Sequence, residues 1–124
     1  MIRSVNLAEK FAQFADHWNA RLAGELNGQQ VRLVKFQGSF TWHHHAQEDE
    51  LFFVVRGEFD MRLREGGLER VERVRAGEFI IVPRGTEHCP YAEREVEVML
   101  FEPASTRNTG NVRDDRTRDT LQGV

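Results

Sequence analysis

The stretch that decides the fold, Trp42 to Gly57, reads WHHHAQEDELFFVVRG. Three consecutive histidines and a group of carboxylates come directly before LFFVV, the most apolar run of the chain. Side chains two residues apart on an extended backbone point to the same face, so His43 and His45 share one side and His44 points to the other. With Glu50, the pair His43 and His45 supplies three of the four groups that a transition-metal site needs.

The bulk composition describes one domain and excludes several kinds of partner. The 124 residues suffice for one hydrophobic core. The 17 basic and 20 acidic residues are mixed along the chain and give a net charge of −3, so we expect no nucleic acid and no membrane as a partner, because both bind basic patches. Cys89 is the only cysteine, which excludes an intrachain disulfide. With no signal peptide or membrane span in the sequence, we expect a cytoplasmic protein.

The rest of the chain predicts one short helix followed by many short strands. Asn6 and Glu9 have the spacing of a helix cap, which predicts a helix over Leu7–Asp16 with an aromatic packing stripe. Asn27-Gly28 is typical of a two-residue hairpin turn. Alternating apolar and polar residues, separated by glycine-containing turns, predict strands at 21–26, 30–37, 42–45, 50–56, 58–64, 68–74, 78–82 and 95–102.

These elements divide the single domain, residues 1–124, into three parts. Residues 1–20 form a helical N-terminal segment, residues 21–103 form the strand-rich part, and residues 104–124 form a polar tail without periodicity. The tail is extended or partly disordered, or else Val112 and Leu121 pin it to the barrel or to a second subunit. A series of short strands with one leading helix predicts an all-β sandwich or barrel.

His88 is the fourth candidate metal ligand. It follows a strand and a Pro-Arg-Gly turn, which places it to return to the same end of a barrel as His43 and His45. Three imidazoles and one carboxylate suit manganese, iron, cobalt, nickel or zinc. Asp49 competes with Glu50 for the carboxylate position. The candidates for fixing the histidine tautomers are Gln47, Glu48, Asp49 and Glu87.

Two motifs of this chain resemble those of the cupin family. The first comprises Gly38, His43, His45, Glu50 and Gly57, and the second comprises Gly77, Pro83, Gly85 and His88. There are two departures from the family pattern. His43 follows Gly38 by five residues where the family usually has six, and Ala92 stands where the second motif often has asparagine. The resemblance covers about residues 33–101.

The resemblance implies a cupin jelly-roll barrel, also called a double-stranded β-helix, with a divalent transition metal at its mouth. Iron, manganese, zinc and nickel are the expected metals, and the implied ligands are His43, His45, Glu50 and His88. The resemblance to small single-domain cupins also implies a homodimer, in which the two chains exchange edge strands or terminal segments.

The function expected from the resemblance is a metal-dependent enzyme acting on a small molecule, such as a dioxygenase, a sugar or uronate isomerase, or a lyase. The alternative is a non-catalytic cupin that binds or senses a small molecule or a metal, and a third possibility is a barrel that has lost its metal. Tyr91 and Glu97 are the candidates for a general base, although neither has a diagnostic spacing. Cys89 is expected to pack in the core.

An apolar ligand pocket with a metal at one end is expected inside the barrel. The candidates for its lining are Phe36, Phe40, Trp42, Phe52, Met61, Tyr91, Met99 and Phe101. Three arginines near the expected mouth are candidates to hold an anionic substrate by bidentate contacts: Arg32, Arg84 and Arg94.

Overall fold

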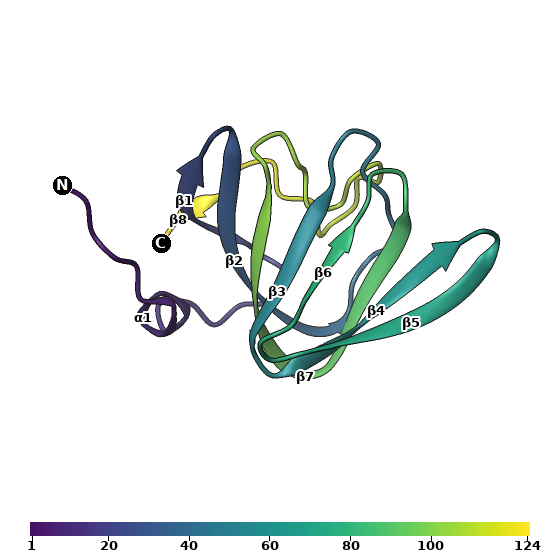
Figure 1. The fold of residues 1–124 in the computed structure, drawn as a ribbon, viewed down its shortest axis with the longest axis horizontal. Helices are drawn as coiled ribbons and strands as arrows, with labels where there is room; N and C mark the ends of the chain where they lie inside the picture. The colour runs from purple at the N-terminus through teal and green to yellow at the C-terminus, as the bar shows by residue number, and fades with distance from the viewer.

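The computed structural model describes residues 1–124 and contains one short helix and eight strands (Figure 1). The helix is α1 (Leu7–Phe11). The strands are β1 (Arg21–Leu26), β2 (Gln29–Ser39), β3 (Glu50–Arg56), β4 (Glu58–Glu65), β5 (Leu68–Arg75), β6 (Phe79–Val82), β7 (Glu87–Pro103) and β8 (Gln122–Gly123). They form a curved, jelly-roll-like sheet that does not close completely, which confirms the predicted all-β class.

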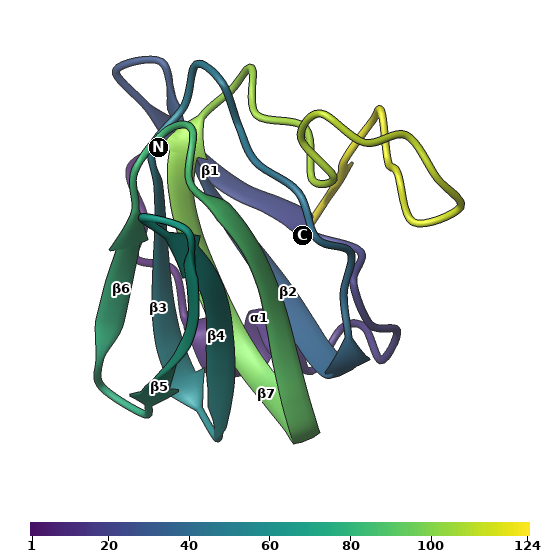
Figure 2. The ribbon, with the colours of Figure 1, turned by 90° about the vertical axis from the view of Figure 1, so that its right-hand side faces the viewer.

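Strand β7 is the centre of the sheet (Figure 2). Along one edge it pairs with β2, and along the other it pairs first with β4 and then with β3. The prediction of a last strand at 95–102 was therefore too short. The register jumps between Ala92 and Val96, opposite Gly38 and Phe36, so residues 93–95 bulge out of the ladder. These polar residues interrupt the alternation that the sequence shows.

Alternating residues of the strands face inward and form the main core, as the sequence predicts for β4 and β7. Phe59, Met61 and Leu63 of β4 are at most 3% exposed. On β7, Val98 and its alternate neighbours face the core, whereas Met99 packs on the outer face. The hairpin at Asn27-Gly28 is also confirmed, and both of its residues have the positive φ that this turn requires.

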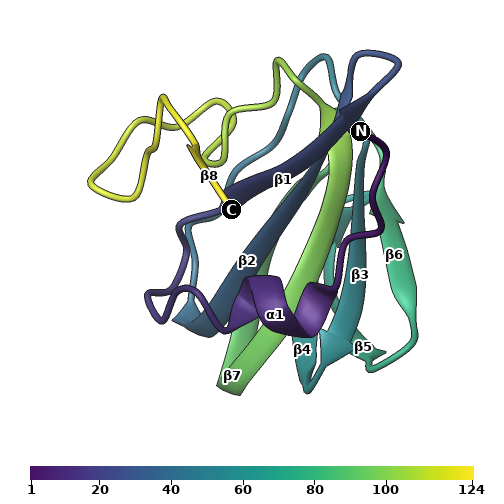
Figure 3. The ribbon, with the colours of Figure 1, turned by 90° about the vertical axis from the view of Figure 1, so that its left-hand side faces the viewer.

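The N-terminal segment covers the outer face of β2 and β7 (Figure 3). Asn6 caps α1, because its Oδ1 accepts a hydrogen bond of 3.0 Å from the amide of Glu9. The helix nevertheless ends at Phe11 and not at Asp16. The amide of Phe14 already donates to the carbonyl of Phe11, three residues earlier, and not to the carbonyl four residues earlier that an α-helix requires. Phe11 and Phe14 pack on Leu33, so β2 is buried on both faces and not on one.

The polar C-terminal segment, residues 104–124, turns back alongside β1, to the right of the strands in Figure 2. Leu121 packs against the main core, and β8 pairs with β1 in parallel. Of the alternatives that the sequence left open, attachment to the barrel through Leu121 is the one the structure shows. Val112 is half-buried, and its carbonyl accepts a hydrogen bond from Thr109 within the segment.

Candidate metal centre

A short antiparallel bridge brings the histidine run beside His88. The predicted strand at 42–45 is reduced to this bridge. The amide of His43 donates to the carbonyl of His88 at 3.1 Å, and the reverse bond measures 2.9 Å. The turn after Pro83 is tied to the same loop, because the amide of Gly85 donates to the carbonyl of His45 at 2.8 Å. Two motifs forty residues apart in the chain thereby meet.

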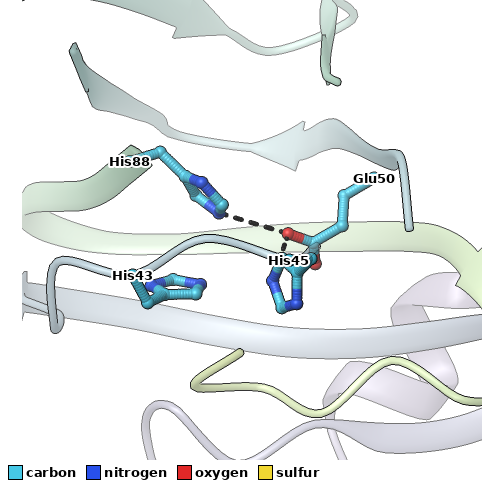
Figure 4. Close-up of side chains that lie close together, drawn as sticks. All are labelled: His43, His45, Glu50 and His88. Carbon is cyan, nitrogen blue, oxygen red and sulfur yellow. Dashed lines mark hydrogen bonds and ion pairs between the residues drawn. The ribbon is translucent and has the colours of Figure 1, made fainter. Parts of the chain in front are cut away.

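The four predicted ligands converge in one buried group (Figure 4). One ligand atom from each of His43, His45, Glu50 and His88 lies within 4.8 Å of all the others. Glu50 Oε1 lies 2.8 Å from His45 Nε2 and 3.2 Å from His88 Nε2. All four side chains belong to residues that are at most 5% exposed, so the group is enclosed by protein.

Backbone carbonyls fix the orientation of two of the imidazoles. His43 Nδ1 lies 2.7 Å from the carbonyl of Thr41, and His88 Nδ1 lies 2.9 Å from the carbonyl of Thr86. A carbonyl only accepts, so each Nδ1 donates a proton in these bonds and each Nε2 is the nitrogen that faces the group. A metal ligand requires a lone pair on that nitrogen, and a bonded second nitrogen is the usual way of presenting it.

The side chains predicted to fix the tautomers have other partners. Asp49 pairs with Arg84, Glu48 accepts from Ser105, and Glu87 pairs with Arg64. That prediction was wrong because it chose side chains that are close to the histidines in sequence. For His43 and His88, the backbone carbonyl two residues earlier takes this role instead. The side chain of Asp49 points to the surface, which leaves Glu50 as the inward carboxylate.

Burial and mutual charge set the protonation of the group. Burial lowers the pKa of His43 from 6.5 to about 3, and the charge of His88 acts in the same direction. Burial alone raises the pKa of Glu50, but the close contacts and charges of His45 and His88 outweigh it and hold that pKa well below its usual range. At neutral pH these two residues are a neutral imidazole and a carboxylate, the forms that bind metals.

The residues present fit a divalent transition metal. His45 Nε2 is buried and makes no hydrogen bond, although Glu50 Oε1 is close by. An unpaired nitrogen facing a carboxylate oxygen and two further imidazoles matches the donor set of iron, manganese, nickel or zinc sites. His44 lies outside the group; its amide donates to Asn111 Oδ1 at 2.9 Å, and its carbonyl accepts from the Asn111 amide at 3.0 Å.

A cavity of about 430 Å³ adjoins the group, and His43 and Glu50 form part of its wall. Its apolar side includes Phe36, Phe40 and Phe52, as predicted. The other predicted lining residues do not line it. Met61 is fully buried in the core. The candidates on β7 lie outside because the alternation of this strand turns their side chains to the outer face. The predicted residues outside the cavity are Trp42, Met61, Tyr91, Met99 and Phe101.

The candidate general bases also lie away from the cavity. Tyr91 is 37% exposed, and the guanidinium of Arg62 lies 5.7 Å from its ring centroid. Glu97 lies on the outer face of β7, opposite Lys35 of β2. Cys89 is buried as predicted, with its Sγ 3.0 Å from Arg62 Nη2.

Of the candidate anion-binding arginines, only Arg32 lines the cavity. Its guanidinium is already occupied, because it donates to Gln30 Oε1 and to the carbonyls of Ala104 and Thr106, and lies 3.4 Å from Glu102 Oε2. Arg84 is exposed and pairs with Asp49, and Arg94 is exposed.

Three parts of the cavity wall were missed from the sequence. Trp18 lies beyond the end of α1 and stacks on Phe36, with ring centroids 4.4 Å apart. Glu102 is a carboxyl that is 1% exposed, and burial together with the charge of Glu50 raises its pKa. Residues of the C-terminal segment form the third part. The inward alternation of β7 pointed to Glu102, and Leu121 was one of the residues expected to pin the tail, but nothing local to the sequence pointed to Trp18 or placed the tail at the cavity.

The fold and the buried His-His-Glu-His group define a class, that of jelly-roll proteins with a group able to bind a metal ion. The chain belongs to the cupin family, because residues 30–102 match the family model described as a cupin domain. It is 34% identical over 80 residues to the uncharacterized protein YdbB of Bacillus subtilis (strain 168), a match that covers 64% of this chain and 62% of that protein's length.

Two solved structures show the same fold. A cupin-2 domain containing protein from Shewanella frigidimarina is 38% identical, with a TM-score of 0.75 over 80% of this chain and 93% of that one. Protein NMB1881 from Neisseria meningitidis is 27% identical, with a TM-score of 0.73 over 82% of this chain and 100% of that one. The only helix of this chain has five residues, too few to cross a membrane.

Proposed function

We propose that this cupin is a divalent-metal-dependent enzyme acting on a small organic molecule. The observation that carries the proposal is the convergence of three imidazoles and a carboxylate within 4.8 Å beside a cavity of about 430 Å³. His43, His45, Glu50 and His88 would hold the metal. A bound metal supplies Lewis-acid chemistry, or redox chemistry in the case of iron or manganese.

The residues of this chain supply the surroundings of such a reaction. The carbonyls of Thr41 and Thr86 orient two of the imidazoles. All four ligand residues are at most 5% exposed. The surrounding protein, including the aromatic wall and the C-terminal segment, therefore shields the group from bulk water. A dry site strengthens every charge interaction within it.

Metal analysis tests the ligand assignment. We expect untagged wild-type protein to hold about one metal ion per chain, and the double variant His45→Ala His88→Ala to hold none. His44→Ala is the matched control, since His44 lies outside the group, and it should keep its metal. Equal metal content in the double variant and in the wild type would contradict the assignment.

A turnover screen of the metal-loaded protein tests the activity. Oxygen uptake with an iron-loaded sample would identify a dioxygenase, whereas product formed without oxygen uptake would identify an isomerase or a lyase. Binding of compounds without any turnover would support the second candidate, a non-catalytic cupin that binds or senses a small molecule. The position of Tyr91 and Glu97 outside the cavity favours that second candidate.

A homodimer is the assembly that the outer surface favours. Strand β6 pairs only with β3, so its other edge presents free backbone groups. Phe79 and Ile81 on β6 are 60% and 53% exposed and lie opposite Phe53 and Leu51 on β3. Such an apolar face beside an open edge suits a second copy of the chain.

The dimer proposal is tested by light scattering after size-exclusion chromatography. The double variant Phe79→Lys Ile81→Lys should run as a monomer, whereas Leu68→Lys, at the start of β5 and 74% exposed, should leave the mass unchanged. A wild-type monomer at high concentration would contradict the proposal.

A further inference from the structure

The cavity contains two buried polar atoms without a partner. Glu102 Oε1 and Thr106 Oγ1 make no hydrogen bond, although their residues are 1% and 4% exposed and both line the cavity. Buried oxygens in folded proteins are nearly always bonded. Two buried oxygens without partners, both on residues of one cavity wall, are therefore a feature that a ligand would complete.

The other polar side chains of the wall are already engaged, apart from the exposed Thr120. Both the nitrogen and the oxygen of the Gln30 side-chain amide make hydrogen bonds, and the hydroxyl of Ser105 donates to Glu48. The remaining members bond to carbonyls, amides or charges of the protein: Arg32, Arg107, Asn108, Arg118 and Asp119. The unmet hydrogen-bonding capacity of the buried wall is thus concentrated at Glu102 and Thr106, apart from the metal-binding group.

The chemistry of the two atoms favours a hydroxyl group as their partner. The hydroxyl of Thr106 both donates and accepts, and the carboxyl of Glu102 accepts when ionised and also donates when protonated. A ligand hydroxyl can meet each of these requirements. The preference therefore holds for both protonation states of Glu102. A carboxylate ligand would instead face Glu102 and Glu50 together, without a free guanidinium from Arg32 to offset them.

The apolar part of the wall favours an aromatic ring. Trp18 stacks on Phe36 and Phe40 with ring centroids 4.4 and 4.7 Å apart, and Phe52 lines the same side. Aromatic faces attract other rings by offset or edge contacts. A cavity of about 150 Å³ is enough for benzene, so about 430 Å³ leaves room for a substituted ring.

We infer that the cavity binds a small aromatic molecule carrying a hydroxyl group, which Glu102 and Thr106 hold by hydrogen bonds. This inference rests on the proposed function, because it names the ligand class of the same cavity. Glu102 and Thr106 would act as specificity-determining residues, and the metal-binding group would face another part of the same molecule.

Calorimetric titration with phenol, toluene and benzoate tests the inference on the full chain, with and without Zn²⁺. We expect wild-type protein to bind phenol about tenfold more tightly than toluene or benzoate, the size of effect that one good hydrogen bond gives. Thr106→Val and Glu102→Met should each reduce the preference for phenol over toluene. Glu102→Gln should retain it, because an amide still bonds to a hydroxyl.

Ser105→Ala is the control, since it removes a neighbouring hydroxyl that is already bonded to Glu48. It should leave the preference unchanged. Equal binding of phenol and toluene to the wild type, tighter binding of benzoate, or an unchanged preference in both Thr106→Val and Glu102→Met would overturn the inference. The two proposals fail separately: a wild type that prefers phenol but binds no Zn²⁺ would refute only the metal-dependent function, and a wild type that binds Zn²⁺ without preferring phenol would refute only this inference.

Discussion

Replacing Gly110 with alanine tests whether the C-terminal segment holds the histidine loop in place. Gly110 has a φ of +54°, and a Cβ atom there would overlap the carbonyl oxygen of His44 and lie 2.9 Å from its carbonyl carbon and 3.1 Å from His43 Cδ2. The left-handed backbone costs alanine about 1–2 kcal/mol. Overlap with atoms that cannot move aside adds about 1–3 kcal/mol, so we expect a total of about 2–5 kcal/mol.

Gly66→Ala is the matched control for this variant. Its φ is +55°, and a Cβ atom there would meet nothing within 4 Å. It therefore carries the backbone strain of about 1–2 kcal/mol without the overlap. The difference between the two variants measures the contact between Gly110 and the loop of His43 and His44.

Three measurements follow the effect. Urea unfolding gives the loss of stability of each variant. Hydrogen exchange at the Asn111 amide, which donates to the His44 carbonyl, shows whether the segment detaches locally. A metal titration then shows whether a displaced loop binds its ion less tightly. If Gly110→Ala matches Gly66→Ala in stability, and its Asn111 exchange and metal affinity equal those of the wild type, the segment does not position the loop.

Three further variants and one control test the core, a buried ion pair and a helix cap. Phe59→Ala removes a ring that is 2% exposed and should lower the free energy of unfolding by about 3–5 kcal/mol, measured in urea. Arg32→Met leaves Glu102 buried without its cationic neighbour and should cost about 3 kcal/mol in the same assay, whereas Arg113→Met, which breaks an exposed pair, should have no measurable effect. Asn6→Ala should cost about 1 kcal/mol and speed hydrogen exchange at the Glu9 amide; unchanged exchange would contradict the cap.

The sequence was sufficient to bring the three histidines together because two separate patterns constrain them, whereas the choice of Glu50 over Asp49 followed the spacing of the family motif. The period of an extended chain separates His43 and His45 from His44. The turn glycine and proline before His88 then indicate where the chain returns. Each signal is local, and the jelly-roll topology brings the two together.

The rest of the cavity wall depends on contacts that no local pattern encodes. Trp18 fits a helical stripe in the sequence, yet the helix ends at Phe11 because Phe11 and Phe14 are drawn onto the outer face of β2. The C-terminal segment has no apolar periodicity, and besides the packing of Leu121 its attachment uses polar bonds such as the one from Thr41 to Asp114. Such bonds become visible only once the fold is known.

The central position of β7 has a consequence for the way the chain folds. This strand, Glu87–Pro103, is the shared partner of β2, β3 and β4, yet it follows all three in the chain. Pairings between segments so far apart in sequence are slow to form, because the entropy of closing a long loop is lost before any stabilising contact is made. During synthesis the apolar faces of the earlier strands therefore stay exposed to solvent until β7 has left the ribosome. We expect the barrel to assemble late and cooperatively, so that the His-His-Glu-His group, which needs His88, is completed in the same step.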